Sequence, residues 1–402
     1  MQMSKRISRF QASPIRRLVP LARRAESNGV KVIYFNIGQP DIKTPVEALD
    51  AVHGYADEVI AYGSSEGEYA LRKSLAEYYR KYNVNDVRPE NIMITTGGSE
   101  ALQFVFMTLC DPDDEVIIPE PFYTNVATFA NIAMVNLCPV TSSFDDAFAL
   151  PPVEDFEKCI NKKTTAILLC SPNNPTGHVY SRDELLQLLE ICRKHDIFLV
   201  VDEVYREFCY DGQKFTSILS FPEYRDRIIC VDSFSKRFSM CGARVGAIVT
   251  FNEDFMADAI KLAQARLCPP AIEQVAAAAA LNAPDEYIQE VVAEYERRRN
   301  TLISAIQEIP GVKVSRPKGA FYFVVDLPVD DAENFAIFML RDFSYNGHTV
   351  FFAPAEDFYV SEGLGRKQAR IAYVKNCEQL LIGAECLKQG LKEYRKRVMG
   401  IK

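Results

Sequence analysis

The chain has 402 residues, of which 48% are hydrophobic and 25% charged, and this balance is typical of a folded globular protein rather than of a disordered or membrane protein. Its formal net charge of −8 argues against a nucleic-acid partner, because neutralising phosphates requires a basic face. The length suggests two structural domains, and such a chain can bury a large site for a small molecule.

Eleven cysteines are scattered singly along the chain and form no CxxC pair. We therefore expect small buried side chains in a reducing compartment and no metal site. The first ten residues are basic without an apolar stretch, and no run reaches the roughly 18 apolar residues that a membrane span requires. These features predict a cytoplasmic protein with no membrane partner.

The first 50 residues contain one apolar run, VIYFNIG, and cannot form a domain alone. We expect the segment 1–50 to pack with the C-terminal part of the chain or with a second subunit.

Seven short apolar runs separated by helical stretches predict strands in the next part of the chain. Several runs, such as AILLC and FLVV, are continuously hydrophobic, as in strands that are covered on both faces. The expected fold class is therefore α/β, with a mostly parallel seven-stranded sheet covered by helices, such as one at 184–195, in a large domain over 51–290. The seven expected strands are 92–95, 115–118, 134–138, 166–170, 198–201, 228–231 and 245–250.

The pattern changes after Pro284, where a long charged helix is followed by three further apolar runs, GAFYFVVDL, TVFFA and RIAYV, and by a final helix. This order predicts a smaller α+β domain over 291–402.

Several segments place polar, Gly-rich or Pro-rich residues directly after expected strands, where open α/β sheets bind ligands. In ITTGGSEAL (94–102), backbone N–H groups between a strand and a helix could hold a phosphate, although a tight turn with a serine cap is the simpler explanation of this segment alone. In CSPNNPTG (170–177), the amides of Asn173 and Asn174 could donate to a ligand oxygen, and a plain turn explains the segment equally well.

Asp202 follows FLVV directly, so its carboxylate should lie near the low-dielectric interior, where an ionised acid is unfavourable without a cation. A structural ion pair or a helix cap would also satisfy this carboxylate. The adjacent Glu203 is expected to be solvated.

A lysine follows another expected strand in VDSFSKRFSMCGARVG (231–246). Lys236 comes after two serine hydroxyls and eight residues before Arg244. Alone it would be interpreted as a surface residue, and only the set of neighbouring strand-end groups makes a role in chemistry the better hypothesis.

Taken together, these segments resemble the fold-type I, class I aminotransferases that use pyridoxal phosphate, in particular the members similar to aspartate aminotransferase. The resemblance runs from NIGQPD at 36 through YGSSEGEYALR at 62, the strand-end segments, PKGAFYF at 317 and RIAYV at 370. SPNNPTG, DEVY and SFSK, with an arginine eight residues after the lysine, occur in the family's order and at its spacing.

The resemblance implies that Lys236 holds pyridoxal 5′-phosphate as an imine and, once displaced by the substrate, moves a proton between substrate and cofactor. It also implies that Asp202 pairs with the pyridine nitrogen, and that Tyr205 and Asn174 donate hydrogen bonds to the cofactor's phenolate oxygen. The other implied cofactor contacts are the backbone of Gly98, Ser99 and Glu100, the side chains of Ser233, Ser235 and Arg244, the stacked ring of Tyr123, with Phe122 in the core, and Tyr62 from a neighbouring subunit.

For the substrate, the resemblance implies that Arg370 binds the α-carboxylate in a bidentate fork, with Gly38 and Asn174 close to the substrate. The implied reaction moves an amino group from an L-amino acid, expected to be aspartate, to 2-oxoglutarate by a ping-pong mechanism through the pyridoxal and pyridoxamine forms. The implied assembly is a homodimer with shared active sites.

The sequence departs from the family pattern where the substrate side chain would bind. Some aspartate-specific relatives have a lysine where this chain has Ser99, which puts the distal-carboxylate contact in doubt. Arg266 in QARLCPP is a candidate for that contact across the subunit interface, although a surface arginine at a helix end explains it as well. Arg237 and Cys241, beside the cofactor lysine, also depart from the pattern.

Other functions stay open at this point. The enzyme could prefer aromatic amino acids or alanine, or it could be a pyridoxal-phosphate-dependent C–S lyase, because the same carbanion can expel a leaving group. A ligand sensor in a transcription regulator would need a DNA-binding domain, and the 35 residues before NIGQPD leave no room for one.

Overall fold

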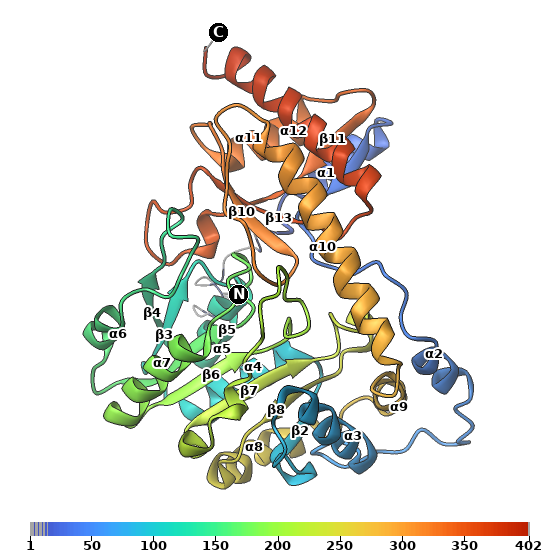
Figure 1. The fold of residues 1–402 in the computed structure, drawn as a ribbon, viewed down its shortest axis with the longest axis vertical. Coiled ribbons are helices and arrows are strands. Elements are labelled where there is room, and N and C mark those ends of the chain that lie inside the picture. Colours follow the sequence, from blue (N-terminus) through green and yellow to red (C-terminus); the bar gives the residue numbers. More distant parts are fainter. Residues whose placement is uncertain (1–3, 5–6, 8–9, 11–12, 14, 401–402) are drawn as a thin grey trace.

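The computed structural model describes residues 4, 7, 10, 13 and 15–400. A seven-stranded sheet lies in the lower body of Figure 1, in the order β2-β8-β7-β6-β5-β3-β4. Only β8 runs antiparallel to its neighbours, so the predicted mostly parallel sheet is confirmed. The strands are β2 (Ile92–Thr95), β3 (Glu115–Glu120), β4 (Asn136–Thr141), β5 (Thr164–Cys170), β6 (Phe198–Asp202), β7 (Ile228–Ser233) and β8 (Gly246–Val249).

Continuous hydrophobicity along these strands results from two separate cores, one on each face of the sheet. Ile167 and Leu169 of β5 pack into one core, whereas Leu168 points to the other face and packs into the second. Successive side chains of a strand point to opposite faces, so a strand that is covered on both sides has no polar face to show in its sequence.

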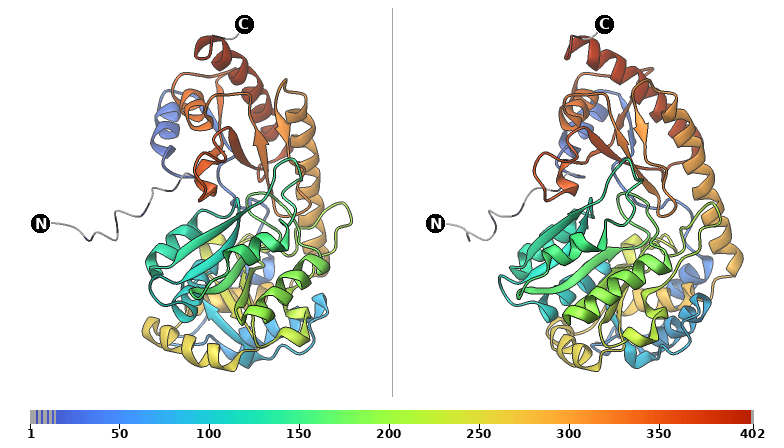
Figure 2. Two further views of the ribbon diagram at one scale, coloured as in Figure 1. Left: turned by 90° about the vertical axis from the view of Figure 1, so that its left-hand side faces the viewer. Right: turned by 60° about the vertical axis from the view of Figure 1, so that its left-hand side comes forward.

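Helices cover both sides of the sheet, as the two views in Figure 2 show. Helix α7 (Arg182–His195) starts two residues before the expected helix because Ser181 and Glu184 form a capping box, and it buries a row of leucines against the sheet. The other helices of this body are α2 (Val46–His53), α3 (Tyr69–Tyr79), α4 (Gly98–Leu109), α5 (Asn125–Ala133), α6 (Val153–Cys159), α8 (Glu253–Arg266) and α9 (Ala271–Ala280).

The upper body in Figure 1 contains a four-stranded sheet in the order β12-β13-β10-β9 and a separate parallel pair, β1 and β11. Long helix α10 (Asp285–Gln307) extends from the larger body into this smaller α+β body. Its other elements are α1 (Val19–Ser27), β1 (Lys31–Tyr34), β9 (Lys313–Val314), β10 (Tyr322–Asp326), α11 (Ala332–Arg341), β11 (His348–Phe351), β12 (Ala353–Pro354), β13 (Gln368–Ala372) and α12 (Cys377–Arg397).

The N-terminal segment lies beside the C-terminal part of the chain. Strand β1 pairs with β11, and α1 packs on α11. Helix α2 instead packs against α9 of the larger body, so residue 50, the expected boundary, falls inside a helix. The exact division into domains stays a prediction.

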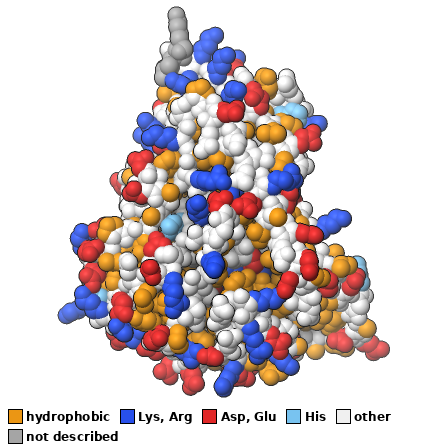
Figure 3. Space-filling model, in the orientation of Figure 1, with side chains coloured by type: hydrophobic (Ala, Val, Ile, Leu, Met, Phe, Trp, Pro, Cys, Tyr) orange, Lys and Arg blue, Asp and Glu red, His pale blue; other side chains and the backbone are white. Residues whose placement is uncertain are grey.

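The described residues contain no helix that is long and apolar enough to cross a membrane, and no cluster of His, Cys, Asp and Glu that could hold a metal ion. All eleven cysteines are free thiols, of which three are buried and the rest partly buried. On the face in Figure 3, acidic and basic side chains are interspersed. Most of the first ten residues, which carry the expectation of no export signal, lie outside the described residues.

Candidate active site

The strand-end segments meet at the carboxyl ends of β5, β6 and β7, on the side of the sheet that faces the smaller body (Figure 1). Two hydrogen bonds join the bodies there. Arg370 Nη1 of β13 donates to Asn174 Oδ1 at 3.1 Å, and the hydroxyls of Tyr205 and Tyr322 are 3.0 Å apart. The site is therefore built by both bodies.

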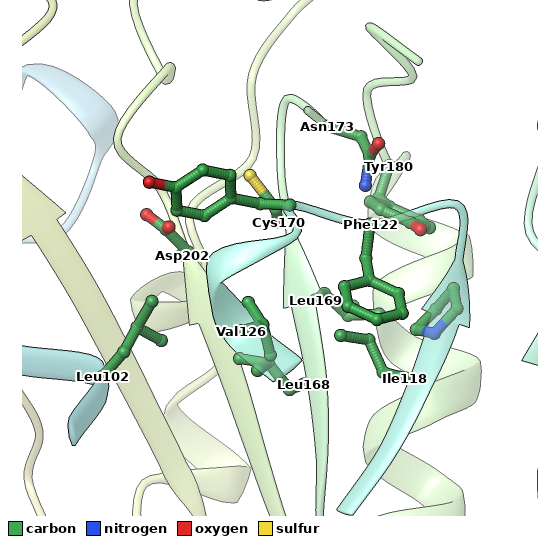
Figure 4. A pocket seen from close by; sticks show the side chains of 12 residues that line it. Leu102, Ile118, Phe122, Val126, Leu168, Leu169, Cys170, Asn173, Tyr180 and Asp202 are labelled. Carbon is green, nitrogen blue, oxygen red and sulfur yellow. The ribbon is translucent and has the colours of Figure 1, made fainter. Parts of the chain in front are cut away.

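Asp202 ends β6 at the polar edge of a pocket whose apolar floor includes Leu102, Val126 and Leu168 (Figure 4). Its Oδ1 accepts a hydrogen bond from the Val204 N–H at 3.1 Å. Burial raises the pKa of its carboxyl group to about 7; that hydrogen bond and Lys236 lower it, and the carboxylates of Asp232 and Glu203 raise it further. No described residue forms an ion pair with Asp202, so the carboxylate is suited to a cationic ligand.

The raised pKa of Asp202 predicts a pH-dependent stability of the cofactor-free protein. Since the native state holds this proton more tightly than the unfolded state, which titrates near 3.8, the contribution to stability is complete below about pH 4 and is lost as the pH rises through about 7. The full shift corresponds to on the order of 4 kcal/mol, and to less where water reaches the carboxylate. Urea unfolding at pH 5 and pH 8 should show this loss in the wild type and not in Asp202→Asn. An identical pH dependence in both proteins would contradict the assignment.

The expectation that Glu203 is solvated is wrong. Its side chain is fully buried, accepts hydrogen bonds from Ser217 Oγ and the Ile218 N–H, and lies 3.4 Å from Arg206 Nη2. Burial raises the pKa of its carboxyl group, and Arg206 and the hydrogen bonds oppose that shift. Glu203 thus belongs to the buried structure behind the site, a role that the arginine three residues later in the sequence could have indicated.

Lys236 lies in the loop after β7 and is partly buried, so it is not a surface lysine. Its Nζ donates a hydrogen bond to the Gly38 carbonyl at 2.9 Å and lies 3.9 Å from Cys241 Sγ. The neighbouring Arg237 points away into the interior, where two hydrogen bonds of 2.7 and 3.2 Å hold it to Asp232. This buried pair fixes the loop on one side of Lys236, so the lysine amine and not the Arg237 guanidinium lies at the site.

The first turn of α4 forms a cradle next to Arg244. Its N-cap is Gly97, at φ 78°, and not a serine. A Cβ atom on Gly97 would lie 2.5 Å from Arg244 Nη2, and one on Gly246 would lie 2.5 Å from the Gly97 carbonyl carbon, so neither position has room for a side chain. Backbone N–H groups in a first helical turn lack intrahelical acceptors, and with the guanidinium they suit an anion such as phosphate.

Predicted phosphate-binding residues surround this cradle. Gly98 and Ser99 are in the first turn of α4, and the hydroxyls of Ser233 and Ser235 are hydrogen-bonded to each other at 2.9 Å close to the start of α4. The Glu100 N–H already donates to the Gly97 carbonyl at 3.1 Å, which makes it a weaker candidate donor than its two neighbours.

Arg266 is neither exposed nor free. Its Nη1 lies 2.6 Å from Glu100 Oε2, and its Nη2 donates to the Ser65 carbonyl at 2.8 Å. The pair offsets the negative charge of Glu100, which would otherwise repel a phosphate at the start of α4. The contact between Arg266 and a substrate carboxylate stays a prediction.

Arg370 is a buried cation that pairs with no acidic side chain in the described part of the chain. Its side chain is 1% exposed, its Nη groups donate to Asn174 Oδ1 and the Asn36 carbonyl, and its Nε has no partner among the described residues. Its guanidinium lies over the rings of Tyr322 and Phe358, 4.5 and 5.1 Å from their centroids. Burial lowers its pKa, against the effect of the nearby tyrosines. A carboxylate ligand would supply the missing charge.

Tyr322 is a site residue that was not predicted from the sequence, although it lies in the motif PKGAFYF. Its hydroxyl bonds to Tyr205, its ring lies against Arg370, and a Cβ atom on Gly38 would lie 1.6 Å from its oxygen. Asn36, whose carbonyl accepts from Arg370, was also missed within NIGQPD. Both lie in motifs that carry the resemblance, and that was the available signal.

Tyr123 and Phe122 both line the pocket at Asp202, but their surroundings differ. Phe122 is 4% exposed and packs in the core on one face of the sheet. The hydroxyl of Tyr123 accepts a hydrogen bond from Asn125 at 2.7 Å, and burial raises its pKa to about 12, with Tyr322 and Arg370 acting on it next. Tyr123 therefore lies close to the site.

Tyr62, which was predicted to reach the site of a neighbouring subunit, has no contact with the site residues of its own chain in the described structure. Its side chain is 79% exposed, and it bonds to none of the described site residues.

Comparison with known proteins supports the same family. The family "Aminotransferase class I and II" matches residues 30–373. A "Probable aspartate/prephenate aminotransferase" from Aquifex aeolicus is 30% identical over 97% of this chain and 99% of its own length, and an "Aspartate aminotransferase" from Bacillus subtilis is 33% identical over 80% and 82%. The solved structure of an "Alanine aminotransferase" from Pyrococcus furiosus has a TM-score of 0.89 at 29% identity and covers 98% of this chain and 100% of its own. A family match over most of the chain and relatives at 30% identity or more show that the chain belongs to the class I and II aminotransferases, which are pyridoxal-phosphate-dependent enzymes.

Proposed function

We propose that this enzyme transfers the amino group of an L-amino acid, in the first place aspartate, to 2-oxoglutarate by a ping-pong mechanism. The observation that carries the proposal is that one site contains two ionisable side chains of opposite charge, each without an ion-pair partner. Among the residues that the structure describes, Arg370 is a buried cation with no acid to pair with, and Asp202 is an acid with no base to pair with. An α-carboxylate and a pyridinium ring would complete both.

The residues of the site fit pyridoxal phosphate at each end. Lys236 Nζ would hold the cofactor covalently, Asp202 would pair with its ring nitrogen, and Tyr205 and Asn174 would donate hydrogen bonds to its phenolate oxygen. Tyr123 would cover the ring. The phosphate would bind the N–H groups of Gly98, Ser99 and, more weakly, Glu100, together with Ser233, Ser235 and Arg244. The bound cofactor supplies a protonated ring that accepts the electron pair left when the substrate loses its α-proton.

Other functions, which are substrate binding, proton transfer and exclusion of water, would fall to residues of the chain. Arg370 would bind the α-carboxylate through two N–H groups and so orient the α-proton, with Asn174 holding the guanidinium. Lys236 Nζ would take that proton, guided by the Gly38 carbonyl 2.9 Å away. Gly38 lacks a side chain, so Tyr322 can approach it closely and exclude water from this part of the site.

We also propose a homodimer in which Tyr62 reaches the phosphate of the partner's site. The support is a stretch of chain that ends at Tyr62 and exposes many apolar side chains, which a monomer would leave in water. Its members are strongly exposed apolar side chains on and after α2: Val46, Leu49, Val52, Val59, Ile60 and Tyr62, with exposed fractions of 41–79%.

A cytoplasmic location is proposed on the state of the cysteines. All eleven are free thiols, which suits a reducing compartment.

The names of the relatives point to more than one amino donor. The Bacillus subtilis relative is an aspartate aminotransferase, and the Pyrococcus furiosus structure is an alanine aminotransferase. Aspartate is preferred in the proposal because curated relatives similar to this chain carry that name repeatedly.

A direct assay with four donors tests the proposal. The holoenzyme is incubated with 2-oxoglutarate and either aspartate, alanine, phenylalanine or a cysteine conjugate, and glutamate is measured, with pyruvate and ammonia measured for the conjugate. Aspartate should give the highest kcat/KM, and aspartate alone should release one equivalent of its oxo acid per active site, as a ping-pong mechanism requires. Ammonia and pyruvate without glutamate would favour the C–S lyase, and preference for another donor would correct the substrate.

A further inference from the structure

The turn at residues 15–18, here called the N-terminal turn, is fixed on both sides of Arg16. The Ile15 carbonyl accepts a hydrogen bond from Asn36 Nδ2 at 2.7 Å. On the other side, Arg17 forms ion pairs of 2.5 Å with Asp357 and with Glu333. The backbone of Arg16 is therefore held in place, while its side chain is exposed.

The N-terminal turn is attached to the surroundings of Arg370 by two contacts. The side-chain amide of Asn36 donates a hydrogen bond to Ile15, and the backbone carbonyl of Asn36 accepts one from Arg370. Ile15 packs on the apolar cluster that contains Phe358, and the Phe358 ring lies against the Arg370 guanidinium. The turn thus lies next to the proposed subsite for the α-carboxylate.

Arg16 carries its charge close enough to Tyr123 to act on that side chain, and no described acid pairs with it. Its guanidinium lowers the pKa of Tyr123, as Arg370 does, whereas burial, Tyr322 and Asp202 raise that pKa. Unlike Arg17, Arg16 has no ion pair with any described residue. A fixed backbone next to the site and an unpaired guanidinium suit a second carboxylate at the far end of a substrate.

Other cations around the site are already engaged. Arg266 is held by Glu100 and the Ser65 carbonyl, and Arg244 lies against the start of α4 and donates to the Cys241 carbonyl. Lys236 is required by the proposed chemistry. Among these described cations, Arg16 remains for the substrate side chain.

We infer that Arg16 binds the distal carboxylate of dicarboxylic amino acids and oxo acids, and so determines the preference for them over substrates with neutral side chains. The inference rests on the proposed function, since it takes Arg370 as the partner of the α-carboxylate. A dicarboxylate would contact both arginines, whereas a monocarboxylate would contact Arg370 alone.

Binding of two unreactive acids to the holoenzyme tests the inference without relying on turnover. Calorimetry gives Kd values for succinate and for propionate in the wild type, Arg16→Ala, Arg16→Lys and the control Arg24→Ala, which removes an exposed arginine of α1. Arg16→Ala should raise Kd for succinate by about 10-fold and Kd for propionate by less than about 2-fold. Arg16→Lys should recover part of the affinity, and Arg24→Ala should match the wild type.

The same variants are then assayed with aspartate and alanine as donors. Arg16→Ala should lower kcat/KM about 10-fold for aspartate and leave alanine nearly unchanged. Equal effects on both acids, or an unchanged succinate Kd, would overturn the role of Arg16. If the wild type binds both acids but transaminates no amino acid, the proposed function fails. The effect of Arg16→Ala on the Kd for succinate, compared with its effect on the Kd for propionate, still tests the role of Arg16. Thermal unfolding of each variant shows whether a loss of affinity reflects a loss of folded protein. If Arg16→Ala does not fold, the comparison is made with Arg16→Lys instead.

Discussion

Replacing Lys236 with alanine is expected to lower kcat by about 10³-fold or more, because one amine both holds the cofactor and moves the proton. The variant should still bind pyridoxal phosphate through the remaining contacts but should not attach it covalently. Reduction with borohydride followed by mass spectrometry measures this attachment. The wild type should carry the cofactor on the peptide that contains Lys236, and the variant should carry none.

A second lysine serves as the control for that experiment. Lys261 is exposed on α8, where it pairs with Asp258, and Lys261→Ala should leave both attachment and turnover unchanged. A reducible adduct that persists in Lys236→Ala, or full turnover in that variant, would disprove the assignment.

Replacing Arg370 with methionine is expected to lower kcat/KM by about 100-fold or more for every amino acid, because the α-carboxylate loses both of its charge-assisted hydrogen bonds. The stability should barely change, within about 1 kcal/mol of unfolding free energy. A buried guanidinium without an anion is unfavourable in the free protein, so its removal relieves a desolvation cost while it breaks two hydrogen bonds. Steady-state kinetics and urea unfolding measure the two effects separately.

A buried arginine that does have acidic partners provides the contrast. Arg299 is fully buried and pairs with Asp211 at 2.7 Å and Glu296 at 3.2 Å. Arg299→Met should remove the buried partner of Glu296 and leave Asp211 with the more exposed Arg316 and Lys318, and it should destabilise the protein by about 2–3 kcal/mol. If Arg370→Met is destabilised as strongly as Arg299→Met, Arg370 is structural and its kinetic effect is indirect.

The sheet could be predicted from the sequence because its signal is local. Each strand is a short hydrophobic run, and the loss of alternation in runs such as 166–170 follows directly from cores on both faces. The candidate residues at the strand ends could be found for a related reason, since strand ends are where such sheets bind ligands.

The partners of charged residues could not be predicted in the same way. Arg266 and Glu100 are 166 positions apart, and Arg370 and Asn174 are 196 apart, so nothing local in the sequence indicates either pair. Glu203 shows the same limit, because the Ser217 hydroxyl and the Ile218 N–H that satisfy its buried carboxylate follow 14 and 15 residues later. Similarity to a family indicates which residues gather at a site but not which neighbour holds each of them.

Construction of the site from two bodies has a consequence for how such an enzyme can be altered. Arg370, Tyr322 and the N-terminal turn belong to the smaller body, whereas Lys236, Asp202 and the anion cradle belong to the larger one. The groups proposed to select the substrate are therefore encoded apart from the groups proposed to carry out the reaction. Substitutions in the smaller body can change which amino acid is accepted while the proton-transfer machinery stays intact, which allows new specificities to evolve or be engineered without rebuilding the chemistry.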